Sequence, residues 1–223
     1  MLLGARQFFE RRGAPSIPTA RDYVQNGLVA MWDGIENAGW GVHDPNATTW
    51  MNLVTGVASA NVGDRTWGDS WLETTGTLHL NLSDNEPNSR TMEAIFQTAS
   101  SDVQNVIMSM YTRRVIGTAG TSIGIAPYSA IPVDTVSGRV WSVAVAYPNE
   151  SNTPDAAYIN GLANTDRTSG NFTNPVSSSI RIGGLYSKPF SGKVYGVRLY
   201  SRQLTSAEIS ANYAIDKARF NLP

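Results

Sequence analysis

The stretch that decides the fold is residues 190–209, FSGKVYGVRLYSRQLTSAEI. In its first half, large apolar side chains alternate with a glycine and an arginine, so that Tyr195, Val197 and Leu199 fall on one face of a predicted strand. Alternation with a period of two indicates a β-strand that buries one face. This predicted strand therefore needs a second layer of structure to cover its apolar face.

The second half of the stretch predicts a helix. The hydroxyl of Thr205 can accept a hydrogen bond from the amide of Glu208, whose carboxylate reaches back to the Thr205 amide, which is the capping-box pattern. Leu204 and Ile209 occupy the positions of a hydrophobic staple. The helix is expected to run to about Ala218 and to fold back against the edge of the sheets.

The same alternation recurs in short runs from residue 26 onward, separated by turn residues. The clearest runs are Leu28, Ala30 and Trp32; Met92, Ala94 and Phe96; Trp141, Val143, Val145 and Tyr147; and Ile180 and Ile182. One heavier face per strand predicts two sheets packed face to face. The expected fold is all-β, a two-sheet antiparallel jelly-roll sandwich formed by a single domain at residues 26–223, with one short C-terminal helix.

Residues 1–25 differ from this pattern and are expected to form an N-terminal arm. Leu2, Leu3, Phe8 and Phe9 are costly to expose, which favours docking on a neighbouring subunit or another protein of a larger particle. The alternative is a frayed terminus. The first residues do not form a secretory signal, because charges interrupt the apolar run. We therefore expect assembly in the cytoplasm and a final place in a virion or at the cell exterior.

Composition excludes several functions. The 223 residues contain 17 Lys and Arg against 18 Asp and Glu, and this balance gives no general attraction to nucleic acid or to an anionic membrane. No apolar stretch approaches the roughly 20 residues of a membrane helix. The chain has no cysteine, so disulfides, thiol nucleophiles and cysteine zinc sites are excluded. No cofactor is expected to be required.

Four segments in order resemble a known family. Residues 27–34 (GLVAMWDG), 50–54 (WMNLV), 157–161 (AYING) and 190–209 are similar to successive motifs of laminin-G-like domains in the concanavalin A-like lectin and glucanase superfamily, as found in phage and bacterial surface proteins. The resemblance implies a jelly roll, in agreement with the periodicity. It also leaves two kinds of function open, because the superfamily contains both glycosidases and lectin-like binding domains.

The acidic residues argue against hydrolysis. The glucanases of that superfamily place paired carboxylates along one strand, and retaining glycosidases need two carboxyl groups about 5 Å apart. Glu93 is the one acid well inside a predicted strand, and its neighbours two positions away are Thr91 and Ile95. With no second carboxylate beside it, we predict no catalytic residues and no enzyme activity.

Two tryptophan-rich loops have the composition of a sugar site. Sugars bind to aromatic rings through their C–H faces and to polar side chains through their hydroxyls. The predicted ligand-binding residues are Trp40, His43, Asp44, Trp67 and Trp71. The alternative is that the tryptophans fill or cover the core.

A calcium ion is a further possibility that the resemblance raises, because many laminin-G-like domains hold one at the sandwich rim. Asp84 and Asp155 lie in loops that offer some of the six to eight oxygens that Ca²⁺ takes. Neither loop has a recognised calcium signature, and turn formation explains both equally well.

Two functions therefore remain open. The first is a structural or display protein of a larger particle, most plausibly a phage virion, with a lectin-like surface domain that binds host or environmental glycans. It predicts a homo-oligomer or a complex with other virion proteins, organised by residues 1–25. The alternative is a free-standing or bacterial surface carbohydrate-binding module, which predicts a monomer. A glycoside hydrolase ranks behind both.

Overall fold

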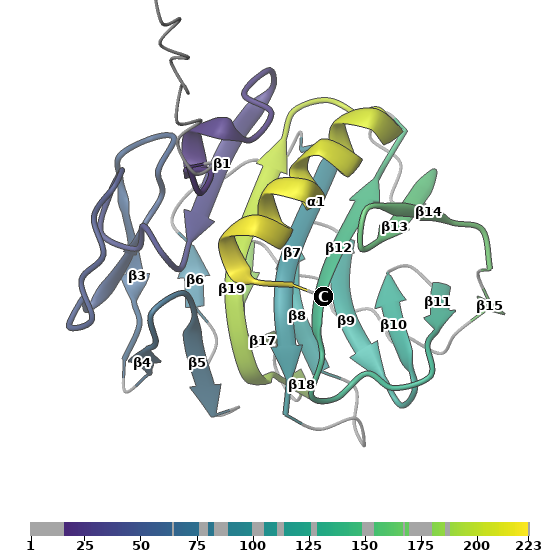
Figure 1. The fold of residues 1–223 in the computed structure, drawn as a ribbon. Coiled ribbons are helices and arrows are strands. Elements are labelled where there is room, and N and C mark those ends of the chain that lie inside the picture. Colours follow the sequence, from purple (N-terminus) through teal and green to yellow (C-terminus); the bar gives the residue numbers. More distant parts are fainter. Residues whose placement is uncertain are drawn as a thin grey trace, which may run out of the picture.

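The structure is a computed structural model that describes residues 16–222, except 64, 76–79, 83–88, 100–104, 111–113, 126–128, 149–153, 167, 170–179 and 186–187. It is a sandwich of two antiparallel sheets with one C-terminal α-helix (Figure 1), so the predicted fold class is confirmed. Three of the four segments that carry the family resemblance fall in this sandwich and its helix, and residues 50–54 fall in a separate small hairpin and its loop. Membership of the laminin-G-like family stays a prediction.

The first sheet has β19 near its centre. Its strands, in spatial order, are β14 (Leu162–Asn164), β13 (Ala156–Ile159), β12 (Val140–Ala146), β7 (Thr91–Thr98), β19 (Ser191–Tyr200), β5 (Leu72–Thr75) and β4 (Thr66–Trp67), and β1 (Leu28–Asp33) also pairs with β19. The second sheet is β15 (Thr168–Ser169), β11 (Ser129–Pro132), β10 (Ser122–Ile125), β9 (Arg114–Ala119), β8 (Asn105–Met110), β16 (Ile180–Ile182) and β6 (Leu80–Leu82).

Two small hairpins and two helices complete the described fold. The hairpins are β2 (Thr49–Met51) with β3 (Ala58–Asn61), and β17 (Gly184–Leu185) with β18 (Lys188–Pro189). A 3₁₀ helix, η1 (Ala20–Asp22), precedes β1, and α1 (Ser206–Phe220) follows β19. In the part of the chain that is described, no helix is long and apolar enough to cross a membrane.

The main core lies between the two sheets and is built by the alternating residues. Trp32, Phe96 and Leu199 enter it from the first sheet, and Ile116 and Ile182 enter it from the second. All five side chains are fully buried. Burying one such side chain stabilises the fold by about 1.5–3 kcal/mol, which is why the period-two pattern determines the layers.

One expectation about β19 is wrong. Tyr195 does not share a face with Val197 and Leu199, because the pairing of β19 with β7 shifts by one residue between Val194 and Gly196. The extra residue at this β-bulge sends Tyr195 to the outer face of the sheet, where its ring packs against Phe220 of α1. A bulge leaves no mark in a simple alternation of residue types.

The helix begins as predicted but lies elsewhere. Thr205 is its N-cap and forms the capping box with Glu208, and the last helical residue is Phe220. Instead of covering the edge of the sandwich, α1 lies across the outer face of the first sheet, over β19, β7 and β12 (Figure 1). The small side chains on that face of β12, among them Ser142 and Ala144, leave room for it.

The capping box makes a pH-dependent contribution to stability that can be tested. Hydrogen bonds from the Arg202 side chain, followed by the Thr205 amide, lower the pKa of Glu208 from its usual 4.5 to about 2. A carboxyl whose pKa is lowered by folding stabilises the fold above pH 4.5, and this contribution is lost as the pH falls towards 2. Thermal unfolding of the wild type and Glu208→Gln should differ most above pH 5 and converge towards pH 2. A difference that is constant across this range would contradict the assignment.

Candidate functional site

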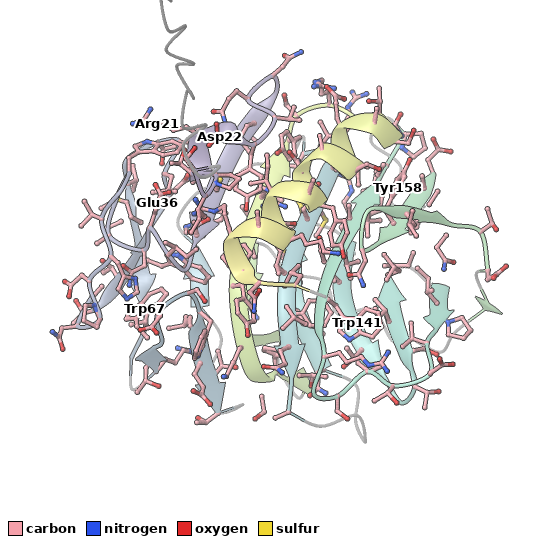
Figure 2. All side chains as sticks on the ribbon, in the orientation of Figure 1. Arg21, Asp22, Glu36, Trp67, Trp141 and Tyr158 are labelled. Atoms are coloured by element: carbon pink, nitrogen blue, oxygen red, sulfur yellow. The ribbon has the colours of Figure 1, made fainter. Side chains whose placement is uncertain are left out.

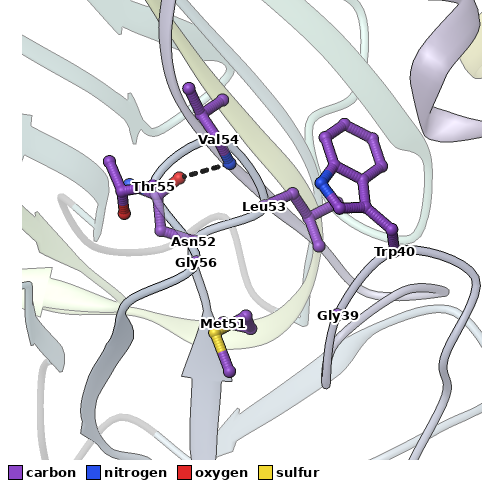
Figure 3. Close-up of a pocket in the computed structure, with 8 residues that line it drawn as sticks. All are labelled: Gly39, Trp40, Met51, Asn52, Leu53, Val54, Thr55 and Gly56. Carbon is purple, nitrogen blue, oxygen red and sulfur yellow. Dashed lines mark hydrogen bonds between the residues drawn. The ribbon is translucent and has the colours of Figure 1, made fainter.

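A pocket of about 360 Å³ lies where two turns of the chain face each other (Figure 3). One wall is the turn that carries Trp40, which follows β1, and the other is the loop that joins β2 to β3. The volume falls within the range of about 300–1,000 Å³ that is usual for small-ligand sites. The lining combines apolar side chains with glycines, an asparagine and a threonine: Gly39, Trp40, Met51, Asn52, Leu53, Val54, Thr55 and Gly56.

The wall that carries Trp40 is a tight turn beginning at Gly39. The amide of Val42 donates to the Gly39 carbonyl at 2.9 Å, and Gly41 has a φ of +70°, as the third residue of a type II turn requires. The buried carboxylate of Glu36 accepts a hydrogen bond from the Gly41 amide at 2.8 Å. The indole of Trp40 is therefore presented by a fixed turn.

The opposite wall is fixed to the sandwich by Asn52. Its side-chain oxygen accepts hydrogen bonds from the amides of Met31 at 3.2 Å and Val54 at 3.0 Å, and the second of these is drawn in Figure 3. The next residue, Leu53, donates its amide to the Met31 carbonyl at 2.8 Å and packs against Met31. Val54 remains 40% exposed at the rim. A residue of the second resemblance motif thus shapes the pocket without being one of the predicted binding residues.

A cation covers the indole of Trp40. The guanidinium carbon of Arg21, in η1, lies 4.3 Å from the centroid of the Trp40 ring. The neighbouring amide of Ala20 donates to Glu36 at 2.9 Å, so the same carboxylate holds the segment of Arg21 and the turn of Trp40. Figure 2 shows Arg21 and Glu36 at one end of the sandwich, away from Trp141.

Beneath α1, one buried arginine joins two carboxylates. Arg198 of β19 binds Glu93 of β7 at 2.6 Å and Asp216 of α1 at 2.7 and 2.9 Å, and the hydroxyl of Tyr23 donates to Asp216 at 2.8 Å. Burial raises the pKa of Glu93, although the nearby Arg198 opposes this. The sequence argument that Glu93 has no carboxylate partner is therefore wrong, because the second acid comes from the helix. The two acids share one cation in the protein interior.

A second buried arginine connects this network to the pocket. Arg219, in the last turn of α1, binds Asp33 at 2.9 Å and Glu36 at 3.2 Å, and donates to the carbonyl of Pro18 at 3.0 Å. Burial raises the pKa of Asp33, and Arg219 opposes that shift. The helix therefore fixes Glu36, and Glu36 in turn holds both the segment of Arg21 and the turn of Trp40.

The predicted tryptophans have different roles. Trp40 lines the pocket, whereas Trp67 and Trp71 do not. Trp67 packs edge-on against the buried Trp50 at 5.2 Å between centroids and donates its indole N–H to a backbone carbonyl at 2.8 Å, as expected of a side chain that covers the core. Trp71 packs against Tyr195, with ring centroids 5.8 Å apart.

The two polar candidates lie in the loop after Trp40 and do not line the pocket. His43 is exposed, and its Nδ1 lies 3.2 Å from the carbonyl oxygen of Ile35. The amide of Asp44 donates a hydrogen bond to the side-chain oxygen of Asn37 at 2.8 Å. The carboxylate of Asp44 accepts a hydrogen bond from the amide of Asn46. These bonds stabilise the loop that leads back to β2.

The structure describes only one of the two calcium candidates, Asp155. Asp84 lies outside the described residues. The carboxylate of Asp155 accepts a hydrogen bond from the Gln203 side chain at 3.2 Å at an exposed position. Across the described ranges, no three His, Cys, Asp or Glu side chains are grouped as a metal site. Calcium binding stays a prediction.

The fold is shared with two kinds of solved protein. A scan against family models and a search of curated proteins gave no match. Trypanosoma rangeli sialidase in complex with sialic acid is similar with a TM-score of 0.58 and 20% identity, over 92% of this chain and 34% of that chain. The ligand-binding domain of botulinum neurotoxin serotype D in complex with N-acetylneuraminic acid is similar with a TM-score of 0.53 and 11% identity, over 84% and 50%. The type G receptor-binding domain has a TM-score of 0.52 and 10% identity, over 86% and 52%.

These likenesses correct the prediction that the chain is not an enzyme. Several of the structures that this chain resembles are sialidases, so the fold gives no reason to exclude catalysis. The prediction relied on a missing carboxylate pair, and sialidases, with a tyrosine nucleophile, are exceptions to the two-carboxylate scheme. The chain spans about a third of the sialidase, and at 20% identity the likeness shows the fold and not an activity.

Proposed function

We propose that this chain is a carbohydrate-binding domain that holds a sugar in the pocket beside Trp40. The observation that carries the proposal is a partly exposed indole on a rigid turn, facing a small pocket whose other wall carries a threonine hydroxyl. A sugar ring presents an apolar C–H face and a polar edge, and this lining offers a partner for each. A few polar groups in a mostly apolar concavity are typical of small-ligand sites.

The similar structures support the same class of ligand. Two of them were solved with a sialic acid bound, and one of these is a ligand-binding domain. They favour the carbohydrate-binding module over the display role among the two functions that the sequence left open. Incorporation in a virion and docking through residues 1–25 stay predictions, and sedimentation of the chain with and without residues 1–20 checks them.

Removing the indole is expected to weaken sugar binding by about tenfold or more, because an aromatic contact contributes about 0.5–1.5 kcal/mol beyond its buried area. The measurement is calorimetry of Trp40→Ala with the best glycan from an array. Trp40→Phe should retain part of the affinity. Trp71→Ala is the matched control, because Trp71 is also a half-buried tryptophan beneath a cation, away from the pocket.

A second measurement does not depend on any variant. Titration of the wild type with that glycan should shift the backbone amide resonances of Gly41, Thr55 and Gly56, which belong to the two walls. Two results would overturn the proposal: an array on which no glycan binds, or shifts and affinity losses that follow Trp71 instead of Trp40.

A further inference from the structure

We infer that the sugar bound in this pocket carries a carboxylate and that Arg21 selects for it. The inference rests on the proposed function and deepens it by naming the chemical class of ligand. Acidic sugars combine a ring that packs on an indole with an anion that a guanidinium binds through two parallel hydrogen bonds.

The side chain of Arg21 is available for such a contact. Its contact with Trp40 is made over the face of the indole, and a cation–π contact of this kind uses no N–H donor. The hydrogen bonds of Arg21 involve its backbone, with its amide donating to Thr19 and its carbonyl accepting from Gln25. Among the residues that the structure describes, no carboxylate lies within ion-pair distance of its guanidinium.

The acids nearest to Arg21 in the chain are committed to other partners. Asp22 accepts hydrogen bonds from the amide and hydroxyl of Thr19 at 2.6 and 2.9 Å, and these bonds lower the pKa of Asp22. Asp33 and Glu36 are buried and bound by Arg219. An exposed arginine beside a pocket, with its local acids engaged elsewhere, is suited to an anionic ligand.

The arginine and the indole are also held in place before any ligand arrives. Glu36 binds the amide next to Arg21 in the chain and the amide next to Trp40, each within 2.9 Å. Arg219 in turn holds Glu36. Less conformational freedom is therefore lost when a ligand contacts both side chains, which favours affinity.

The chain contains a matched control for this arginine. The ammonium of Lys193 lies 3.9 Å from the centroid of Trp71, so it forms a second cation–π pair on the surface. Lys193 pairs across the sheet with Glu73, an acid that the Arg21–Trp40 pair does not have. Removing Lys193 changes the protein's net charge by the same amount as removing Arg21, without touching the pocket of Trp40.

The test compares acidic sugars with uncharged forms of the same sugars. Calorimetry measures a sialic acid glycoside against its methyl ester, and a glucuronoside against its methyl ester, which separates the two sources of a sugar carboxylate. The wild type should bind at least one acid about tenfold more tightly than its ester. Arg21→Ala should bring that ratio close to one. Arg21→Lys should keep part of the ratio, and Lys193→Ala should keep all of it.

The outcomes separate the two proposals. Equal binding of both acids and their esters by the wild type would overturn the inference and leave the proposed function standing. A ratio that falls equally in Arg21→Ala and Lys193→Ala would also overturn it, because the preference would then follow net charge. If no glycan binds at all, the proposed function itself fails. Unchanged melting temperatures of the Arg21 and Lys193 variants confirm that each result concerns binding.

Discussion

Replacing Asp216 with alanine is expected to lower the free energy of unfolding by about 3–5 kcal/mol, because the change removes one partner of a buried ion pair. Two nitrogens of Arg198, the hydroxyl of Tyr23 and the hydroxyl of Ser142 all lose their acceptor. Arg198 is 2% exposed, so water cannot replace the carboxylate without opening the contact between α1 and the sheet. Glu93 alone would then balance the buried cation.

Urea unfolding monitored by tryptophan fluorescence measures this loss. Asp216→Asn keeps an oxygen acceptor and should lose less than Asp216→Ala. Lys217→Ala is the control, since it changes the exposed next residue of the same helix and should move stability by less than about 0.5 kcal/mol. A loss of under 1 kcal/mol for Asp216→Ala would show that the buried contacts of Arg198 do not hold the helix to the sheet.

Replacing Gly192 with alanine is expected to cost about 3 kcal/mol or more, from backbone strain and overpacking together. Gly192 has a φ of +147°, and it lies between Thr98 of β7 and Thr74 of β5 in the first sheet. A Cβ atom there would overlap the carbonyl oxygen of Gln97 and lie 2.9 Å from the Cα of Thr98. Both atoms belong to the backbone of β7, so no change of rotamer relieves the clash.

Gly138→Ala separates strain from clash. Gly138 also has a positive φ, +76°, but a Cβ built there has no neighbour within 4 Å. It should lose only the strain of the left-handed region, about 1–2 kcal/mol. Equal midpoints of urea unfolding for the two variants would mean that β7 and β19 can separate freely at this point, contrary to the prediction.

Residues 190–209 predict the strand and the helix, but they do not predict which distant residues these elements contact. The glycine at position 192 and the arginine at position 198 are recognisable as parts of a motif, but their roles depend on partners far along the chain. Gly192 is needed because β7 passes too closely for a side chain, and Arg198 is neutralised by Glu93 and Asp216. Periodicity identifies the faces of a strand, whereas it contains no information about which distant charge lies opposite. Alternation also fails to place Tyr195, because the β-bulge reverses the alternation locally.

The candidate site was predictable only in part. Composition selected the loops rich in tryptophan, and Trp40 indeed lines a pocket, but the same composition selected Trp67, which covers the core. The two differ in what they pack against, which depends on the fold and not on neighbouring residues. Arg21 and Glu36 carried no local signal, because each gains its role from segments that the sandwich brings together.

The central place of β19 has a consequence for how the protein is made. β19 joins β7 on one side to β5 and β1 on the other, and all three precede it in the chain. During synthesis, the part of the first sheet that contains β7 is therefore not joined by strand pairing to β5 and β1, among the described strands, until residue 200 has left the ribosome. Until β19 is available, strand edges and apolar faces of this sheet remain exposed to solvent. Nascent chains that end before β19 should therefore be recognised by chaperones and degraded.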